Sequence, residues 1–206
     1  MQRVITYVDG FNLYFGLKTS GFKKYYWLDL PRLSTALLKH DQQLVATHYF
    51  TARIRTNGRN ADDTKRQTIY IDALAAQPNL TVHEGHFLEK VGNCKSCGAT
   101  WRTFEEKMTD VNIAAHMLAD AYEDRFDTAF IVSGDSDLTT PIQQVRKRFP
   151  DKRLIVVFPP NRQSAQLKRT ANGTLVIGED KLRQNQLPDP VISASGFALH
   201  RPAHWR

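Results

Sequence analysis

Four aspartates stand where a folded chain could bring their carboxylates together. Asp9 follows a short apolar stretch, Asp135 and Asp137 follow the run TAFIVSG, and Asp110 begins a stretch with helical periodicity. Carboxylates gathered in one partly desolvated place repel one another, and a hard divalent cation relieves that repulsion. Mg²⁺ accepts a few carboxylates, retains several waters and also binds phosphate oxygens. Because such a cation polarises a phosphodiester and activates water, the pattern favours metal-dependent phosphodiester chemistry.

Alternating strand-like and helix-like stretches have to position these acids. Residues 3–8 form a strand-like run that ends at Asp9, and residues 128–132 form a buried strand before Asp135 and Asp137. Such alternation predicts a parallel sheet that is covered by helices on both faces. Ligands of these sheets bind outside the carboxyl ends of the strands, near the point where the strand order reverses. We therefore expect three of the four aspartates at this edge.

The same periodicities predict the remaining elements. Strands are expected at residues 44–51, 80–83, 154–158 and 174–177, and helices at 31–39, 63–76, 111–122 and around Leu167. Asp63 is a candidate N-cap, and Thr140, Pro141 and Gln143 fit the Ncap, N1 and N3 positions of a capping box. Residues 84–104 interrupt the alternation and are expected to form an excursion from a domain that covers residues 1–186. The tail, residues 187–206, is expected to wrap that domain.

Each aspartate also has an ordinary structural interpretation. Asp110 would complement the dipole of its own helix, with Thr109 as the cap. The other three would be turn residues beside glycines. The interpretation as a shared site gains weight because three independent segments deliver carboxylates to one edge of the sheet.

The overall composition is that of a basic, folded protein. The 206 residues suffice for one α/β domain with a sizeable core, and 41% of them are hydrophobic and 24% charged. No apolar run approaches the roughly 18 residues of a membrane span, and the N-terminus lacks the pattern of a signal peptide. With two cysteines and no export signal, we expect a cytoplasmic protein without a membrane partner. The net charge of +7 and the pI of about 9.5 favour polyanionic partners such as nucleic acid.

Three sequence blocks resemble the signature blocks of NYN-domain proteins, which belong to the PIN-like nuclease superfamily. The blocks are VDGFNLY at 8–14, EEKMTDVNIA at 105–114 and SGDSDL at 133–138. Further likeness lies in RQTIYIDAL at 66–74, FPP at 158–160 and RPAHW at 201–205. The resemblance therefore covers nearly the whole chain, and the LabA-like bacterial branch is the nearest.

This resemblance implies a three-layer α/β/α fold with a mainly parallel sheet, and cleavage of RNA that depends on Mg²⁺ or Mn²⁺. Carried over by position, the acidic cluster consists of Asp9, Asp110, Asp135 and Asp137. Asn12 is then the polar neighbour that helps to orient metal or phosphate, and Ser133 shapes the loop. His116 departs from the pattern, because many relatives carry an acidic residue at its position.

A structural zinc site is a further candidate. His83, His86, Cys94 and Cys97 supply the four nitrogen and sulfur ligands that zinc prefers. Their order, HxxH followed by CxxC, is not that of a standard zinc finger. The alternative is a pair of reduced thiols at a turn, with the two histidines at the end of a strand.

Basic side chains offer a surface for the phosphates of RNA. The candidates are Arg53, Arg55, Arg59, Lys65 and Arg66 around a loop and helix start, and Lys168 and Arg169 in a second cluster. Their alternative role is that of an ordinary solvated face. Unpaired bases could stack on aromatic residues, although packing in the core is expected for most of these: Tyr14, Phe15, Tyr25, Tyr26 and Trp27.

Taken together, these features favour a metal-dependent ribonuclease, and an endonuclease in particular, that acts on single-stranded or structured RNA. A module that binds RNA or a protein without turnover is the main alternative. A phosphohydrolase of small phosphates is a third, but the chain has neither a P-loop nor a DxD motif at its first strand. No pattern in the sequence indicates an oligomeric interface.

Overall fold

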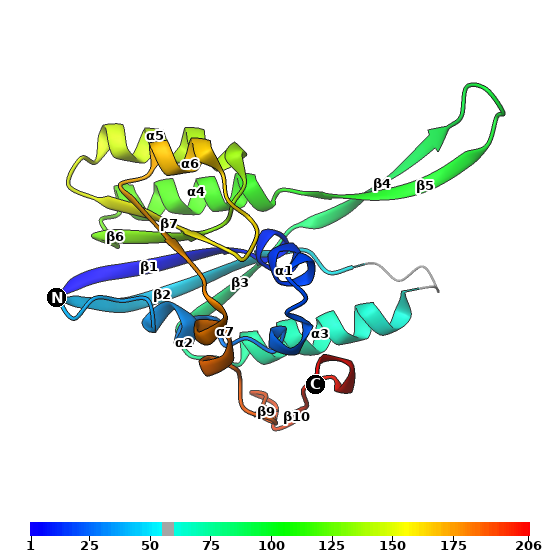
Figure 1. The fold of residues 1–206 in the computed structure, drawn as a ribbon, viewed down its shortest axis with the longest axis horizontal. Coiled ribbons are helices and arrows are strands. Elements are labelled where there is room, and N and C mark those ends of the chain that lie inside the picture. The colour runs from blue at the N-terminus through cyan, green and yellow to red at the C-terminus, as the bar shows by residue number, and fades with distance from the viewer. Residues whose placement is uncertain (55–59) are drawn as a thin grey trace.

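The structure is a computed structural model that describes residues 1–54 and 60–206 (Figure 1). Within these residues, one sheet holds six parallel strands in the order β3-β2-β1-β6-β7-β8. They are β1 (Gln2–Asp9), β2 (Gln42–Thr51), β3 (Leu80–Glu84), β6 (Thr128–Val132), β7 (Arg153–Phe158) and β8 (Gly173–Val176). The strand order reverses between β1 and β6. The two strands that carry Asp9 and Asp135 at their carboxyl ends are therefore neighbours.

Helices cover both faces of this sheet (Figure 1). One face packs against α1 (Gly10–Thr19), α2 (Leu30–Thr35), α3 (Ala61–Ala75) and α7 (Glu179–Gln184). The other face packs against α4 (Thr109–Tyr122), α5 (Thr139–Arg148) and α6 (Ala165–Thr170). The three-layer α/β/α fold is thereby confirmed. In residues 1–54 and 60–206, no helix has the length and apolar composition needed to cross a membrane.

The central strand β1 shows why the sheet is sandwiched. Its side chains alternate between the two faces, as the period of a strand requires. Val4 and Val8 join the core beneath α1 and α3, whereas Ile5 and Tyr7 join the core beneath α4 and α5. All four are at most 2% exposed. A strand that is apolar on both faces needs a helical layer on each side.

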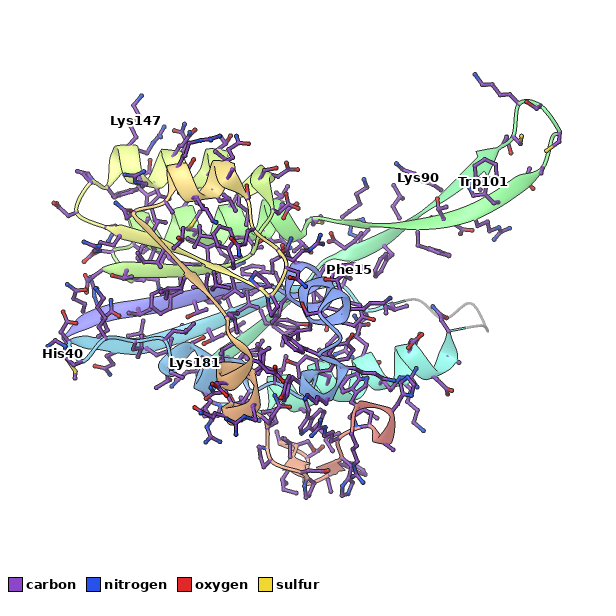
Figure 2. The ribbon with its side chains drawn as sticks, viewed as in Figure 1. Phe15, His40, Lys90, Trp101, Lys147 and Lys181 are labelled. Atoms are coloured by element: carbon purple, nitrogen blue, oxygen red, sulfur yellow. The ribbon has the colours of Figure 1, made fainter. Side chains whose placement is uncertain are left out.

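The excursion expected in residues 84–104 is a long antiparallel hairpin that projects from the body (Figure 1). It consists of β4 (His86–Asn93) and β5 (Thr100–Lys107), which pair only with each other. Trp101 and Lys90 lie on the projecting part, away from the helices (Figure 2). The Trp101 side chain is 51% exposed, so the outer hairpin has no core of its own.

The C-terminal tail folds back onto the α1 and α3 side of the sheet. After a short hairpin of β9 (Val191–Ile192) and β10 (Ala198–Leu199), the turn η3 (Ala203–Trp205) places Trp205 against other aromatic rings. The Trp205 ring lies 5.6 Å from Tyr26 and 6.0 Å from Tyr70, measured between ring centroids. These contacts bury Trp205 to 8% exposure and fix the end of the chain on the domain.

Three local expectations differ from the structure. The helix α1 directly after β1 was not expected, because its residues GFNLYFGLKT carry two glycines and aromatics at unremarkable spacing. Asp63 lies inside the first turn of α3 and does not cap it. The capping box at Thr140 is wrong, because the short 3₁₀ turn η2 (Ser136–Leu138) runs straight into α5, whose N-cap is Leu138, two residues before the predicted one.

Ion pairs close the edge of the sheet at the amino ends of the strands. The Arg3 guanidinium lies 2.7 Å from Asp127 Oδ1 and 3.1 Å from Asp124 Oδ2. Lys152 Nζ binds Asp124 Oδ1 at 2.6 Å and the carbonyl of Phe126 at 2.8 Å. The charges that hold this edge therefore lie at the end of the strands opposite to the aspartates of interest.

A cluster of three histidines lies between the sheet and α4. His48 Nδ1 and His83 Nε2 are 2.9 Å apart, and His83 stacks on Phe50 with 4.7 Å between ring centroids. His116 from α4 lies 4.1 Å from the His83 ring. Burial, with a smaller effect from the neighbouring histidines, lowers the pKa of His83 to about 4. Burial also lowers the pKa of His48, although Asp120 opposes that shift.

The histidine cluster predicts a stability that falls in acid. Because the pKa of His83 is about 4 in the folded protein and near 6.5 otherwise, its contribution is complete above pH 6.5 and is lost as the pH falls towards 4. His83→Gln should flatten this decline by at most about 1.4 kcal/mol per pH unit, and by less with solvent screening. Urea unfolding between pH 4.5 and 7.5 measures the slope. His40→Gln, at an exposed position (Figure 2), is the control and should leave the slope unchanged.

Candidate active site

Asp9 ends β1 and caps the helix that follows it. Its Oδ1 accepts a hydrogen bond from the backbone N–H of Asn12 at 2.9 Å, which makes Asp9 the N-cap of α1. Its Oδ2 accepts a hydrogen bond from Ser133 Oγ, also at 2.9 Å. The turn needs Gly10, because a Cβ there would lie 2.7 Å from the carbonyl of Phe50. Asp9 is only 4% exposed, so its carboxylate is fixed by the chain on both sides.

The loop after β6 brings the next two aspartates to the same edge. Gly134 N–H donates to Asn12 Oδ1 at 2.8 Å, and the N–H of Asp135 donates to Ser133 Oγ at 3.0 Å. Asp135 Oδ1 accepts a hydrogen bond from the N–H of Asp137 at 3.0 Å and thereby caps the 3₁₀ turn. Asp135 is half-buried, whereas Asp137 is exposed. Ser133 shapes this loop through hydrogen bonds to both neighbouring aspartates, Asp9 and Asp135.

The fourth aspartate comes with a glutamate that the sequence did not single out. Asp110 lies in the first turn of α4. Glu106, at the end of β5, accepts hydrogen bonds from the N–H of Thr109 at 3.1 Å and from its hydroxyl at 2.5 Å. Between them, Met108 has a φ of 85°, so the chain turns sharply from the hairpin into the helix. Glu106 raises the pKa of both Asp9 and Asp110, which places it within their electrostatic reach.

The carboxylates of this site repel one another. Burial raises the pKa of Asp9 to about 6, although the hydrogen bonds from Asn12 and Ser133 oppose the rise. Burial, together with the nearby carboxylates of Asp9 and Asp135, raises the pKa of Asp110 to about 7. Perturbed carboxyl groups of this kind cluster at functional sites. The structure thus brings all four predicted aspartates into electrostatic contact.

The donor set fits a hard divalent cation. Its oxygens come from carboxylates, which Mg²⁺ and Mn²⁺ prefer. A nearby positive charge reduces the repulsion between these carboxylates. Within the described residues, no three acid, histidine or cysteine side chains stand close enough to hold an ion as they are. The carboxylates act on one another electrostatically, and water or phosphate oxygens would have to complete the coordination of an ion held there.

A polar pocket of about 250 Å³ opens beside Asp135. Its lining comes from the β1–α1 turn, the loop after β6 and the loop after β7: Asn12, Gly134, Asp135, Ser136, Asn161, Arg162 and Gln163. Two of these loops touch, because a Cβ on Gly134 would lie 2.5 Å from the carbonyl oxygen of Arg162. Arg162 Nε is buried without a hydrogen-bond partner in the described residues. A guanidinium in this position can receive a phosphate.

A larger groove of about 990 Å³ begins on the other side of α1. Gly10, Thr51 and Glu106 line it near the carboxylates, and apolar rings from α1, α3, the hairpin base and the C-terminal turn line the rest. The aromatic members are Phe11, Tyr14, Phe15, Tyr26, Tyr49, Tyr70, Phe87, Phe104 and Trp205. The carboxylates therefore lie between a polar pocket and an aromatic groove.

The zinc prediction requires a correction, because the structure separates the four ligands. His83 packs on His116 in the core between β3 and α4, and His86 begins β4. Cys94 and Cys97 lie at the tip of the hairpin, where Cys94 N–H donates to the carbonyl of Ala99 at 2.8 Å. The eight residues of β4 span roughly 25 Å at 3.3 Å per residue. One ion cannot bind all four side chains across that distance.

The predicted basic residues have different surroundings. Arg53 binds Glu84 at 2.9 Å and Asp72 at 3.0 Å, so it joins β3 to α3 and is less available to RNA than the sequence suggested. Arg66 pairs with Asp63 at the mouth of the aromatic groove. The other predicted basic residues stay predictions: Lys65, Lys168 and Arg169 are exposed, while Arg55 and Arg59 lie outside the described residues.

Two site residues were missed in the sequence, and the aromatic residues divide into two groups. Glu106 stands in the block EEKMTDVNIA, and Arg162 lies two residues after FPP, so each is within or beside a motif of the sequence. Tyr25 and Trp27 are buried in the core, as expected for most of these rings. Tyr14 and Phe15 are 40% and 41% exposed and face the groove.

The raised pKa of Asp110 predicts a stabilising substitution in metal-free protein. A carboxyl group whose pKa rises to about 7 on folding destabilises the fold increasingly as the pH rises from about 4 to 7. In EDTA at pH 8, Asp110→Asn should therefore melt about 2–4 °C higher than the wild type, which corresponds to about 1 kcal/mol for a chain of this size. At pH 4 the difference should vanish. Equal melting temperatures at pH 8 would show that the carboxylates do not repel one another.

Comparisons with known proteins agree with this architecture. The chain matches the NYN domain family over residues 3–178. It is 28% identical, over 208 residues, to 6-hydroxy-3-succinoylpyridine 3-monooxygenase HspA of Pseudomonas putida, an alignment that covers 84% of this chain but 64% of that protein. The crystal structure of a protein of unknown function from Vibrio parahaemolyticus shares the fold at 16% identity, with a TM-score of 0.55 and coverage of 90% of this chain and 96% of that one. Since the family match spans most of its length, the chain belongs to the NYN domain family, which is part of the PIN-like nuclease superfamily.

Proposed function

We propose that the protein is a metal-dependent ribonuclease that hydrolyses RNA phosphodiester bonds. The observation that carries this proposal is the set of mutually repelling carboxylates at the point where the strand order reverses. Asp9 and Asp110 hold raised pKa values that cost the metal-free fold stability. Such a cost is expected where a cation and a phosphate are bound. RNA is the proposed partner, Mg²⁺ or Mn²⁺ the proposed cofactor, and the cytoplasm the proposed location.

Each residue has a proposed part in this chemistry. Asp9, Asp110, Asp135 and Asp137 would hold the cation, and Glu106 would add negative charge beside Asp110. When bound, a divalent cation polarises the phosphodiester and activates water for attack. Ser133 and the N–H of Asn12 keep the Asp9 carboxylate in place, so little reorganisation is needed when substrate arrives. Asn12 also lines the polar pocket, where its side chain fixes the loop at Gly134.

The polar pocket supplies a place for a phosphate next to the one that reacts. Arg162 brings a permanent positive charge to it, and its Nε has no hydrogen-bond partner in the described residues. An arginine can donate two parallel hydrogen bonds to one phosphate, which fixes the strand as well as attracting it. We infer that Arg162 positions the RNA backbone relative to the carboxylates.

Two other functions are distinguished by experiment. A module that binds RNA or a protein without turnover would use the same surfaces and would show no cleavage. Insertion of one oxygen atom into a small aromatic ring, with O2 and an external two-electron reductant as co-substrates, is a second candidate, because the relative from Pseudomonas putida is named as a monooxygenase of a pyridine and the groove is lined by aromatic rings. Binding of 6-hydroxy-3-succinoylpyridine at micromolar concentration, measured by calorimetry, would favour this candidate over the ribonuclease.

The first functional prediction concerns the cation. Labelled RNA should be cleaved in Mg²⁺ or Mn²⁺, and EDTA should abolish the cleavage reversibly. Asp135→Asn keeps the hydrogen bond to the N–H of Asp137 but removes one negative charge. Its cleavage rate should fall about a hundredfold or more, the usual scale for loss of one electrostatic group at a reaction centre.

Matched measurements separate this effect from damage to the fold. Asp135→Asn should melt no lower than the wild type in EDTA, because repulsion with Asp110 decreases. Asp151→Asn changes an exposed aspartate at the opposite edge of the sheet and should retain full activity. Wild-type rates in Asp135→Asn, or wild-type cleavage that survives thorough chelation, would refute the proposed mechanism.

The second functional prediction concerns the phosphate contact. Arg162→Gln should weaken RNA binding roughly 10- to 100-fold, which is what a charge-assisted hydrogen bond contributes. The dependence of binding on salt should also decrease by about one released ion. Arg148→Gln, at an exposed position in the last turn of α5, is the matched control. Fluorescence anisotropy in EDTA gives both quantities, and an unchanged affinity for Arg162→Gln would place the RNA backbone elsewhere.

A further inference from the structure

The aromatic groove is continuous with the carboxylate site. Glu106 lines the groove and accepts a hydrogen bond from the N–H of Thr109, the residue before Asp110, so the groove begins beside the acids. Gly10 belongs to the same wall and follows Asp9 directly in the chain. A polymer whose backbone lies at the carboxylates would therefore have its next units beside the groove.

The groove presents ring faces as well as apolar volume. Tyr14, Phe15 and Phe104 line it and are 40%, 41% and 38% exposed, so three large rings of one cavity are accessible together. Behind them, the Trp205 ring packs at 5.6 Å on Tyr26, which itself lies 5.2 Å from Tyr14. Tyr14 is thus supported by Tyr26 and, behind it, by the buried ring of Trp205.

Positive charge accompanies these exposed rings. Lys18 Nζ lies 5.7 Å from the Tyr14 ring centroid and 5.9 Å from that of Phe15. The Arg162 guanidinium lies 5.9 Å from the Phe15 ring on the side of the polar pocket. Phe15, which lies on α1 (Figure 2), is therefore close to Lys18 of the aromatic groove and to Arg162 of the polar pocket. Alternating cations and rings suit a ligand that alternates phosphates and flat bases.

We propose that the aromatic groove binds unstacked nucleobases of the RNA strand whose backbone lies at the carboxylates. This inference rests on the proposed ribonuclease function and specifies its substrate as single-stranded RNA. Bases in a duplex are paired and stacked on each other, so they cannot turn their faces to Tyr14 and Phe15. The volume of about 990 Å³ is at the upper end of the range for small-molecule pockets and accommodates flat heteroaromatic rings.

A nucleic acid explains the groove better than an apolar peptide does. The groove opens onto a cluster of carboxylates at one end, and Lys18, Lys23 and Arg66 line it farther along. An apolar peptide would gain nothing from these charges, whereas phosphates pair with the cations and bases cover the rings. The acids then face the part of the strand to which a divalent cation is bound.

Binding measurements without cleavage test the inference. The protein carries Asp135→Asn and is kept in EDTA, so that any bound RNA stays intact. Three fluorescein-labelled probes are compared: a single-stranded RNA of mixed sequence, the same RNA in a duplex, and the same strand with consecutive abasic sites. The abasic strand keeps its phosphates and loses only its bases. We expect single-stranded RNA to bind at least tenfold more tightly than either of the other two.

Variants locate the binding to the groove. Tyr14→Ala and Phe15→Ala should each weaken binding of the intact single strand by about fivefold to a hundredfold, the range for loss of one base–aromatic stack. Neither should change binding of the abasic strand. Tyr122→Ala removes a 66% exposed ring at the far end of α4 and is the matched control. Tyr14→Leu retains apolar bulk, so loss of binding in both Tyr14 variants identifies the ring itself and excludes a collapsed groove.

The outcomes separate this inference from the proposed function. Equal affinity for the intact and abasic strands, or unchanged affinity in both Ala variants, would overturn the groove assignment even if the wild type cleaves RNA. Base-dependent binding by a wild type that never cleaves RNA would support the groove and overturn the ribonuclease. If the duplex binds tightly and Phe15→Ala keeps wild-type affinity, the protein binds the RNA backbone and not the bases, which would also overturn the groove assignment.

Discussion

A buried carboxylate joins the two halves of this fold at the place where chemistry is proposed. One oxygen of Asp9 caps α1, and the other accepts a hydrogen bond from Ser133 at the end of the neighbouring strand β6. The same two segments are tied a second time, because Asn12 Oδ1 accepts from Gly134 N–H. Asp9 is thus a structural residue and a member of the acidic cluster at once. The ordinary interpretation as a residue that shapes the turn is confirmed by these hydrogen bonds, and the functional interpretation stays a prediction.

Two groups of titrating side chains act on the stability of the metal-free fold in opposite directions. The carboxylates of Asp9 and Asp110 destabilise it as the pH rises, because their pKa values are raised. The histidines His48 and His83 destabilise it as the pH falls, because theirs are lowered. A cation of the proposed kind would relieve the first effect, whereas the second arises in the core between the sheet and α4. We therefore expect binding of such a cation to stabilise the fold mainly at neutral and alkaline pH.

The sequence predicted most of what depends on short-range periodicity. The strand β6 has the expected bounds, Thr128–Val132, because five consecutive buried residues leave no other interpretation. Loop positions were harder, since Arg162 enters the site only because the backbone at Gly134 touches it, a contact between segments far apart in the chain. The zinc prediction was wrong because spacing in the sequence does not give distance in space. His86 and Cys94 are close in sequence, but an extended strand separates them.

The ends of the parallel strands divide the molecule into two regions with different requirements. The carboxyl ends carry mutually repelling carboxylates and open cavities, and the amino ends carry the ion pairs of Arg3, Asp124, Asp127 and Lys152. Salt screening or substitution of the ion pairs at the amino ends is expected to leave the carboxylates at the carboxyl ends unaffected. Labels, cross-links or a surface tether attached near Lys152 would consequently report on the molecule without entering the cavities. The topology of the sheet thus leaves the edge at the amino ends of the strands free for chemical attachment, because no reaction is expected there.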